Sequence, residues 1–244
     1  MNHTIGNNVP MQDSKKVCID KATQLLDRGK IMLERLDVSA GSEIEDTAQK
    51  KCIGANLHRG FFHPSPIYDL VIGNVKRGRL VDISAANGEL THLYFYNQQG
   101  ALIRVESWFR NRLAYTEHLI YEPDRILGVT CNHLGILAAV SEEMYVQGIL
   151  RSFSPANFHH LDNLYSCFEL RMEDYCYDKE GLSACKMRIF SPGSDYLIDK
   201  QYSFRRDNGF LTLCIDENPT SVQKEYPIRR KRMAQPTVHP VFRP

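Results

Sequence analysis

Residues 94–108 of this 244-residue chain read YFYNQQGALIRVESW. Apolar and polar side chains alternate on both sides of an interruption at residues 97–100, NQQG. Alternation with a period of two is typical of a half-buried β-strand, and asparagine and glycine supply the left-handed backbone conformations that tight hairpins require. The stretch therefore predicts two antiparallel strands joined by a short turn.

Turn signals of the same kind recur from Ile67 onward. Most contain glycine shortly after Asn or Asp, and they lie at residues 74–80, 87–90, 97–102, 132–137, 178–182 and 207–211, with a Pro-Asp turn at 122–127. A turn signal every ~8–12 residues is typical of an antiparallel β protein. The sequence predicts a mostly β fold, a twisted antiparallel β-meander.

The meander is predicted to contain two pseudo-repeated halves. Residues 94–100 (YFYNQQG) align with residues 175–181 (YCYDKEG), and residues 115–121 align with residues 198–204. The second pair needs an offset two residues longer, which extra residues in the loop SPGSD, residues 191–195, would explain. Self-similarity at a fixed offset is a sign of internal duplication.

The segments that flank the β region have a different pattern. Residues 14–37 place Cys18, Ala22 and Leu25 on one stripe with a 3.6-residue period, which predicts an amphipathic N-terminal α-helix. The expected organisation is a disordered N-terminus (1–13), the helix and a connecting segment (14–66), an antiparallel β-repeat domain (67–226) and a basic, proline-rich tail (227–244).

Charge and composition argue against several classes of partner. The chain has 30 basic and 29 acidic residues, so no global field attracts nucleic acid or an anionic membrane. The N-terminus lacks the apolar core of a signal peptide, and no apolar run approaches the ~18 residues of a membrane span. The basic run Arg229 to Arg232 is interpreted as a solvent-exposed segment where the chain leaves the folded domain, and its role is left open.

The cysteines and the motifs favour a protein without a cofactor. The seven cysteines are odd in number and form no C-x-x-C pair, which predicts reduced thiols in a cytoplasmic protein and no zinc site. No nucleotide-binding loop, nucleophile elbow or H-E-x-x-H motif is present, so no catalytic residue, cofactor or metal is predicted. A binding protein is favoured over an enzyme.

One face of the predicted strands carries two misplaced charges. Residues 113, 115, 117, 119 and 121 share a face, as do residues 196, 198, 200, 202 and 204, and both faces are rich in aromatic and aliphatic side chains. Glu117 and Lys200 occupy these otherwise apolar faces. Three explanations stay open: the register curls at a bulge or both tips reach solvent, the two charges pair with each other, or they form a functional pocket.

The opposite face offers a set of contact residues. Leu102, Arg104, Glu106 and Trp108 share a strand phase, and Thr116 and His118 lie on the more polar side of the next predicted strand. A tryptophan beside an arginine is typical of a binding anchor, although Trp108 would also suit a position under the N-terminal helix. The predicted binding residues are therefore Arg104, Glu106, Trp108, Thr116 and His118, with Glu117 and Lys200 as the alternative site.

The hairpin motifs add a resemblance to a known family. YFYNQQGALIRV and YCYDKEGLSACKM resemble the Tyr-Asp (YD, or Rhs-type) repeat, whose core is Tyr-[Asp/Asn]-x-x-Gly-x-Leu, over about residues 74–215. Stand-alone chains with such YD-like or MORN-like strands resemble immunity proteins of bacterial polymorphic toxin systems. The resemblance implies a non-enzymatic protein that masks a toxin domain.

Two other functions are kept beside this one. The first is a small-ligand-binding or hydrolytic β-barrel with a site around Glu117 and Lys200, and the second is a structural YD-repeat protein. An open sheet edge would also allow pairing with a second copy of the chain.

Overall fold

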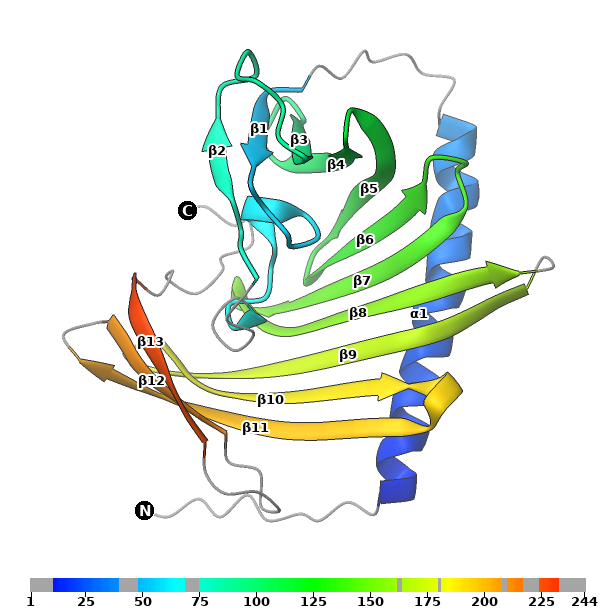
Figure 1. Ribbon diagram of the computed structural model, residues 1–244. Coiled ribbons are helices and arrows are strands. Elements are labelled where there is room, and N and C mark those ends of the chain that lie inside the picture. The colour runs from blue at the N-terminus through cyan, green and yellow to red at the C-terminus, as the bar shows by residue number, and fades with distance from the viewer. Residues whose placement is uncertain are drawn as a thin grey trace.

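The described residues form one large antiparallel sheet with one long helix behind it (Figure 1). The structure is a computed structural model that describes residues 11–39, 48–68, 75–161, 164–179, 181–207, 210–216 and 224–232; within these ranges, side chains are described for residues 12–36 and from 48 to 205. Neighbouring strands follow the order β13-β12-β11-β10-β9-β8-β7-β6-β5-β4-β3-β1-β2. From β3 to β13 each strand pairs with the next in the chain, which confirms the predicted antiparallel meander.

The sheet contains thirteen strands among the described residues. Their bounds are β1 Lys50–Ile53, β2 Arg79–Val81, β3 Leu90–Tyr96, β4 Leu102–Phe109, β5 Arg112–Glu122, β6 Arg125–Asn132, β7 Leu137–Val146, β8 Ile149–Leu161, β9 Leu164–Asp178, β10 Gly181–Ser191, β11 Tyr196–Asp207, β12 Phe210–Asp216 and β13 Lys224–Arg232. Two short 3₁₀ turns, η1 (Gly60–Phe62) and η2 (Pro192–Ser194), complete the described secondary structure together with α1 (Met11–Ser39).

Both stretches that suggested the meander are chain reversals. Between β3 and β4 the Gly100 N–H donates to the Asn97 carbonyl at 3.0 Å, and Gly100 has φ +76°, a conformation that glycine adopts without strain. The Asn97 side-chain oxygen also accepts the Ala101 N–H at 2.9 Å. In the second stretch, β9 ends at Asp178 and β10 begins at Gly181, which has φ +119°. The hairpin prediction is confirmed at both sites.

Helix α1 packs across β6 to β9 on the side that we call the outer face (Figure 1). Cys18, Ala22 and Leu25 are buried there, as the helical stripe predicted, in a cluster that includes Leu127 and Val140. The helix axis lies close to the sheet because Gly29 has no side chain: a Cβ at this position would be 2.4 Å from Val140 Cγ2. The helix also extends beyond the predicted range 14–37 at both ends.

Polar contacts hold the same helix in place. Glu142 of β7 is buried, accepts hydrogen bonds from Lys21 and Arg28 of α1, and lies 3.6 Å from Arg125. Arg28 also donates to Glu122 at 3.0 Å. None of the helices in the described part of the chain combines the length and the apolar character that a membrane crossing requires.

The opposite, inner face of the curved sheet contains the second hydrophobic cluster. Its largest fully buried members include Tyr94 on β3 and Tyr202 on β11. Residues 54–68, which we call the plug segment, lie in front of this face, and the plug residues Ala55 and Ile67 belong to the cluster (Figure 1). The inner face therefore packs against the chain's own loop.

The sheet includes more of the chain than the sequence predicted. Strand β1 lies inside the predicted connecting segment 14–66 and pairs with β3. At the other end, β13 continues through Arg232, so the basic run from Arg229 belongs to a strand paired with β12 and not to the tail. Residues 1–10 and 233–244, predicted to be terminal extensions, lie outside the described residues.

Candidate functional site

The plug segment directs an arginine into the centre of the inner face. Arg59 and Gly60 both adopt left-handed backbone conformations, with φ 62° and 55°. Gly60 leaves no room for a side chain, since a Cβ would be 2.6 Å from the His92 ring and 2.8 Å from the Tyr94 hydroxyl. That hydroxyl donates to the Arg59 carbonyl and accepts the Phe61 N–H, both at 3.1 Å. The tight turn therefore fixes the direction of the Arg59 side chain.

Arg59 forms a buried ion cluster with two strands. Its Nε and Nη2 donate to the two carboxylate oxygens of Glu117 on β5, at 3.0 and 2.5 Å, and its Nη1 donates to Glu143 on β7 at 2.5 Å. Nη2 also lies 3.2 Å from Ser141 Oγ. We call Arg59, Glu117, Ser141 and Glu143 the Arg59 cluster. Arg59, Glu117 and Glu143 are at most 4% exposed, so the charges are removed from water and depend on one another.

The sheet backbone makes space for this cluster at one position. Gly128 on β6 lies beneath the guanidinium, where a Cβ would be 2.3 Å from Glu117 Oε1 and 2.4 Å from Ser141 Oγ. Burial alone would raise the pKa of Glu117, but the Arg59 guanidinium and His58 hold it below its ordinary value. Burial alone would lower the pKa of Arg59, and Glu117 and Glu143 reverse that effect and raise it. Arg59 and Glu117 are therefore both charged at neutral pH.

A second cluster lies farther along the same face. Ser65 Oγ donates to Glu173 Oε2 at 2.5 Å, the Tyr175 hydroxyl donates to the same carboxylate, and Arg171 Nε lies 2.6 Å from Glu173 Oε1. We call Ser65, Arg171, Glu173 and Tyr175 the Glu173 cluster. Burial, together with the Glu173 charge, raises the pKa of Tyr175 well above its ordinary value, so the phenol remains a donor. The plug is thus attached to β9 as well as to β5 and β7.

Neutral histidines complete the polar inner face. His63 is 7% exposed, accepts the Ser65 N–H at Nδ1 and stacks on Tyr68 with ring centres 5.5 Å apart. Burial and the nearby Arg171 and Arg77 lower the pKa of His63 well below its ordinary value. Burial likewise lowers the pKa of His92 to about 4. Both rings are therefore uncharged at neutral pH.

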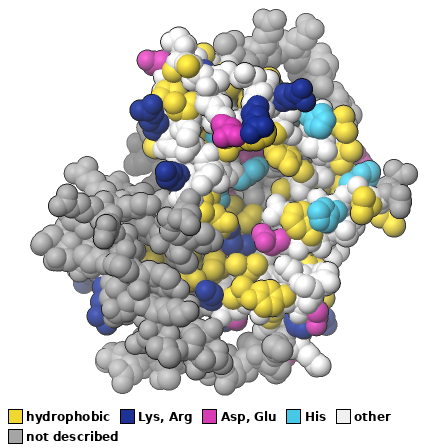
Figure 2. Space-filling model, viewed as in Figure 1, with side chains coloured by type: hydrophobic (Ala, Val, Ile, Leu, Met, Phe, Trp, Pro, Cys, Tyr) yellow, Lys and Arg dark blue, Asp and Glu magenta, His cyan; other side chains and the backbone are white. Residues whose placement is uncertain are grey.

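A cavity of about 160 Å³ opens between the plug segment and strands β6 to β9. Its lining combines polar and apolar side chains: Asn56, Leu57, His58, Arg59, His63, Pro64, Tyr68, Thr130, Ala139, Ser141, Phe153, Pro155, Asn157, Glu169 and Arg171. Figure 2 shows hydrophobic, histidine and charged side chains mixed on this side of the molecule. We call this space the inner cavity.

The sequence-predicted charges on the inner face do not meet each other. The structure confirms that Glu117 and Lys200 both face the inner side, since Leu119, Tyr202 and Phe204 of the same strand phases are buried there. Within the described side chains, however, Glu117 pairs with Arg59 and lies 3.7 Å from His58. Lys200 lies on β11 opposite Met187, with β6 to β10 between it and β5. Solvent exposure of the Glu117 tip, one part of the first explanation, is wrong because this side chain is buried.

The five outer-face residues lie side by side, but Leu102, which was predicted to share their strand phase, belongs to the inner cluster because the β3–β4 register shifts between Phe95 and Tyr96. Arg104 is directly opposite His118, and Glu106 is directly opposite Thr116, so β4 and β5 present them side by side next to Trp108. The Trp108 indole N–H donates to Glu106 at 3.1 Å, and Arg104 lies over the Phe95 ring at 3.9 Å. We call Arg104, Glu106, Trp108, Thr116 and His118 the outer-face patch. All are partly exposed, and α1 packs chiefly on β6 to β9, beside this patch.

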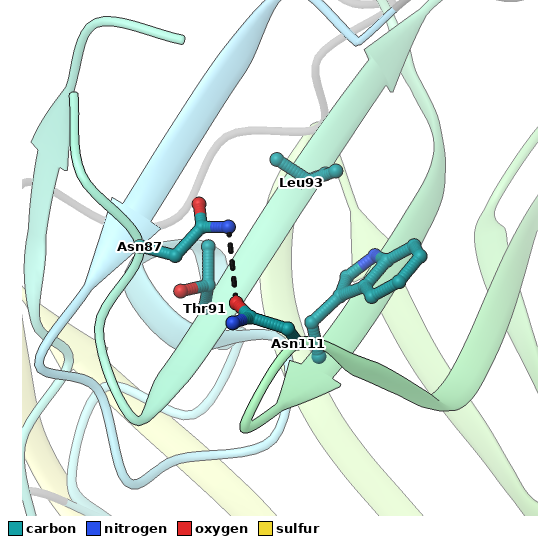
Figure 3. A pocket seen from close by; sticks show the side chains of 5 residues that line it. Asn87, Thr91, Leu93 and Asn111 are labelled. Atoms are coloured by element: carbon teal, nitrogen blue, oxygen red, sulfur yellow. Dashed lines mark hydrogen bonds between the residues drawn. The ribbon is translucent and has the colours of Figure 1, made fainter. Parts of the chain in front are cut away.

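A smaller cavity of about 140 Å³ adjoins the patch at Trp108. Figure 3 shows Thr91 and Leu93 of β3 lining it, with Asn87 and Asn111 joined by a hydrogen bond of 3.3 Å. Lys51 is buried nearby and donates to Asn87 Oδ1 at 2.9 Å, which fixes that amide. The wall is mainly Leu93, Thr91 and the indole, so the space is more apolar than the inner cavity.

Most of the inner-face residues carry no clear signal in the sequence. Arg59, His63 and Ser65 lie in a segment without periodicity, so nothing in the sequence placed them against the sheet. Arg171 and Glu173, in contrast, alternate with Tyr175 as Glu117 alternates with Tyr115, a strand-phase signal that was available. Among the described side chains, no group of three or more His, Cys, Asp and Glu residues is arranged to hold a metal ion.

Comparisons with known proteins do not assign the chain to a family. No protein-family description and no curated protein matches the sequence. A porin-like protein from Bacteroides uniformis is similar to part of the structure, with 13% identity over 56% of this chain and 87% of that chain. The TM-score of 0.20 is too low for this likeness to support any conclusion about fold or function.

Proposed function

We propose that the protein binds a small polar molecule in the inner cavity. The observation that supports this best is the lining: donors and acceptors from the plug segment and from β6 to β9 converge on one space, next to two buried ion clusters. Cavities with a few fixed polar groups and shifted pKa values are where ligands bind most often. The ion clusters would hold the lining rigid before a ligand enters.

Binding fits this geometry better than acid–base catalysis. Glu117 and Glu143 accept from Arg59, and Glu173 accepts from Ser65 and Tyr175, so these carboxylates are engaged with fixed donors. A general base needs a free lone pair near the reacting group and a pKa near the working pH. The low pKa of Glu117 makes it a poor base, so its role in this proposal is to hold Arg59.

A substitution that fills the cavity tests the proposal. Ala139 of β7 lines the inner cavity, and Ala139→Leu adds a side chain into that space. Compounds from a small-molecule library that raise the Tm of the wild-type protein should lose at least tenfold in affinity with Ala139→Leu. Ala114→Leu on β5, at a partly exposed alanine outside the lining, is the matched control and should keep full affinity. If every such compound binds Ala139→Leu as tightly as wild type, the inner cavity is not the site.

The outer-face patch supports a second candidate, a protein that masks a toxin domain. The specific observation is that the five residues predicted from the sequence lie on neighbouring strands of one face, beside the part that α1 occupies. Such a patch, with a tryptophan fixed by Glu106 and flanked by charges, has the composition of a protein-binding surface. This candidate agrees with the resemblance to immunity proteins.

The second candidate is tested with the product of the adjacent gene. The full chain should co-purify with that protein, and Trp108→Ala should weaken the complex by more than about tenfold. Tyr196→Ala, at an exposed aromatic residue of β11, serves as the control. Failure to bind the neighbouring protein, or equal binding by both variants, would argue against the masking function.

A further inference from the structure

Arg171 carries hydrogen-bond donors that the described residues do not use. Its side chain is buried, with the residue 7% exposed, and it lines the inner cavity. Nε faces Glu173 at 2.6 Å, and the guanidinium carbon lies 3.9 Å from the centre of the Tyr68 ring. The Nη atoms form no hydrogen bond to any residue that the structure describes. Nε is itself buried without a well-aligned hydrogen bond to the described residues, so Arg171 has donor capacity for an acceptor that enters the cavity.

The shape of these donors selects the acceptor. Tyr68 and Glu173 fix the plane of the guanidinium by stacking and by an ion pair on one edge. A planar guanidinium fork matches the two oxygens of a carboxylate and binds them by parallel, charge-assisted hydrogen bonds. Arg171 is therefore suited to a carboxylate that enters the cavity.

A carboxylate of the protein lies at the other side of the same space. Glu169 precedes Arg171 by two residues on β9, so both side chains point to the inner face, about 7 Å apart along the strand. Its hydrogen bond with Asn157 is long, at 3.5 Å, and leaves its other lone pairs available. An ammonium group would find its acceptor there.

Net charge argues against an anion without a compensating cation. Glu169 lines the cavity and Glu117, Glu143 and Glu173 lie beside it, against three arginines, Arg59, Arg77 and Arg171, so the acidic groups are in excess by one. A purely anionic ligand would be repelled by the excess of acidic groups, whereas a ligand with both charges would complement them. The volume of about 160 Å³ suits a ligand of about the size of an amino acid.

We infer that the inner cavity binds a small zwitterion, whose carboxylate is held by Arg171 and whose ammonium group is held by Glu169. Leu57, Pro64, Phe153 and Pro155 form the apolar part of the lining, against which an aliphatic chain would pack. This inference deepens the proposed function and rests on it, because it names the ligand class of the same cavity.

The experiment uses the full-length protein and free amino acids as probes. Each of the twenty L-amino acids is titrated by calorimetry, and the tightest one is compared with its carboxamide and its N-acetyl derivative. Removing either charge should weaken binding to the wild-type protein at least tenfold. Arg171→Lys keeps a positive charge beside Glu173 but loses the planar guanidinium fork. This variant should bind the parent amino acid at least tenfold more weakly than wild type, whereas its affinity for the carboxamide should change little. Glu169→Gln should remove most of the preference for the free amine.

The control is Arg151→Lys. Arg151 of β8 lies over the Tyr177 ring at 5.3 Å, a similar stacked arrangement, but it is not part of the cavity lining. This variant should bind the amino acid as wild type does, and circular dichroism should show that all variants are folded.

The outcomes separate this inference from the proposed function. If no amino acid binds, or if both derivatives bind as tightly as the parent, the zwitterion assignment is wrong. The proposed function still stands in that case, provided that another compound binds the wild-type protein and no longer binds Ala139→Leu. If no compound shows this dependence on Ala139, both are wrong.

Discussion

Arg59 is the residue at which the plug segment and the sheet meet. It bridges β5 and β7 through Glu117 and Glu143, and its own carbonyl accepts from Tyr94 on β3. Replacing a buried ion pair by apolar residues can be neutral, but removing one partner leaves the others charged and without compensation. The effect of a substitution here therefore depends on which member of the cluster remains.

Arg59→Met should lower the free energy of unfolding by about 3–5 kcal/mol, because Glu117 and Glu143 stay buried without their cation. Urea titration measures this loss. The double variant Arg59→Met/Glu117→Gln should recover part of it, since one of the two stranded charges is then removed. Arg110→Met, at an exposed arginine 3.1 Å from Glu89, should change stability by less than about 1 kcal/mol. Equal losses for the two single variants would contradict the buried pairing.

His92 gives the protein a predictable dependence on pH. Its pKa is lowered to about 4 in the folded state by burial, against about 6.5 in an unfolded chain. Between these values the unfolded state binds the extra proton, so stability is complete above about pH 6.5 and falls as the pH decreases toward 4. His92 should contribute up to about 1.4 kcal/mol per pH unit to this slope.

His92→Asn tests the contribution, because the amide can still meet Ser107, which lies 3.0 Å from His92 Nδ1. Chemical unfolding between pH 4 and 6.5 should show a shallower slope for this variant than for His133→Asn, which removes a histidine from an exposed hairpin. The same slope in both variants would mean that His92 does not titrate as described. Buried His63, whose pKa is also lowered, would add to the remaining slope.

At the scale of elements, the docking of α1 on β7 depends on the absence of a side chain at Gly29. Alanine normally favours a helix over glycine by about 1 kcal/mol. Here the added methyl group would meet Val140 Cγ2 at 2.4 Å, and Val140 is fully buried between helix and sheet. Close packing should therefore outweigh helix propensity.

Gly29→Ala should destabilise the protein by about 1–3 kcal/mol instead of stabilising it. Adding Val140→Ala should reverse the sign, so that Gly29→Ala becomes neutral or favourable in that background. Thermal unfolding of the four members of this cycle measures the coupling. A stabilising Gly29→Ala in the wild-type background would show that the helix lies farther from β7.

At the scale of the whole molecule, one curved sheet holds a helix on its outer face and its own plug segment on its inner face. The two hydrophobic clusters share the sheet backbone, and each is completed by polar contacts: Glu142 with α1, and Glu117, Glu143 and Glu173 with the plug. The plug forms one wall of the inner cavity, so we expect access to the cavity to depend on it.

Arg77 is expected to control that access, because it donates to the carbonyls of His63 and Ser65. Arg77→Met should speed amide hydrogen exchange in residues 57–67 by roughly tenfold, as the loss of about 1.4 kcal/mol of local stability implies. Amide exchange in β6 to β9 should stay unchanged in Arg77→Met. The control Arg79→Met, at an exposed arginine of β2, should leave the exchange rates of all residues unchanged. Uniform acceleration over the whole sheet would instead mean that the plug and the sheet open together.

The sequence by itself determined the meander, the helix and the composition of two faces. Local rules suffice for these features: Gly100 is needed for its left-handed turn, and period-two alternation assigned Glu117 to the packed face and Arg104, Glu106, Trp108, Thr116 and His118 to the other. Their alignment across β4 and β5 follows because each strand is paired with its neighbour in the chain.

Only the tertiary structure decided what lies against each face. Partners such as Arg59 and Glu117, 58 residues apart, come together through the curvature of the sheet and the path of a segment that has no periodicity. For the same reason the sequence offered Lys200 as a partner for Glu117, when the burial of that carboxylate is compensated by an arginine from the plug. Alternation shows which way a side chain points, but what it meets there depends on contacts between distant parts of the chain.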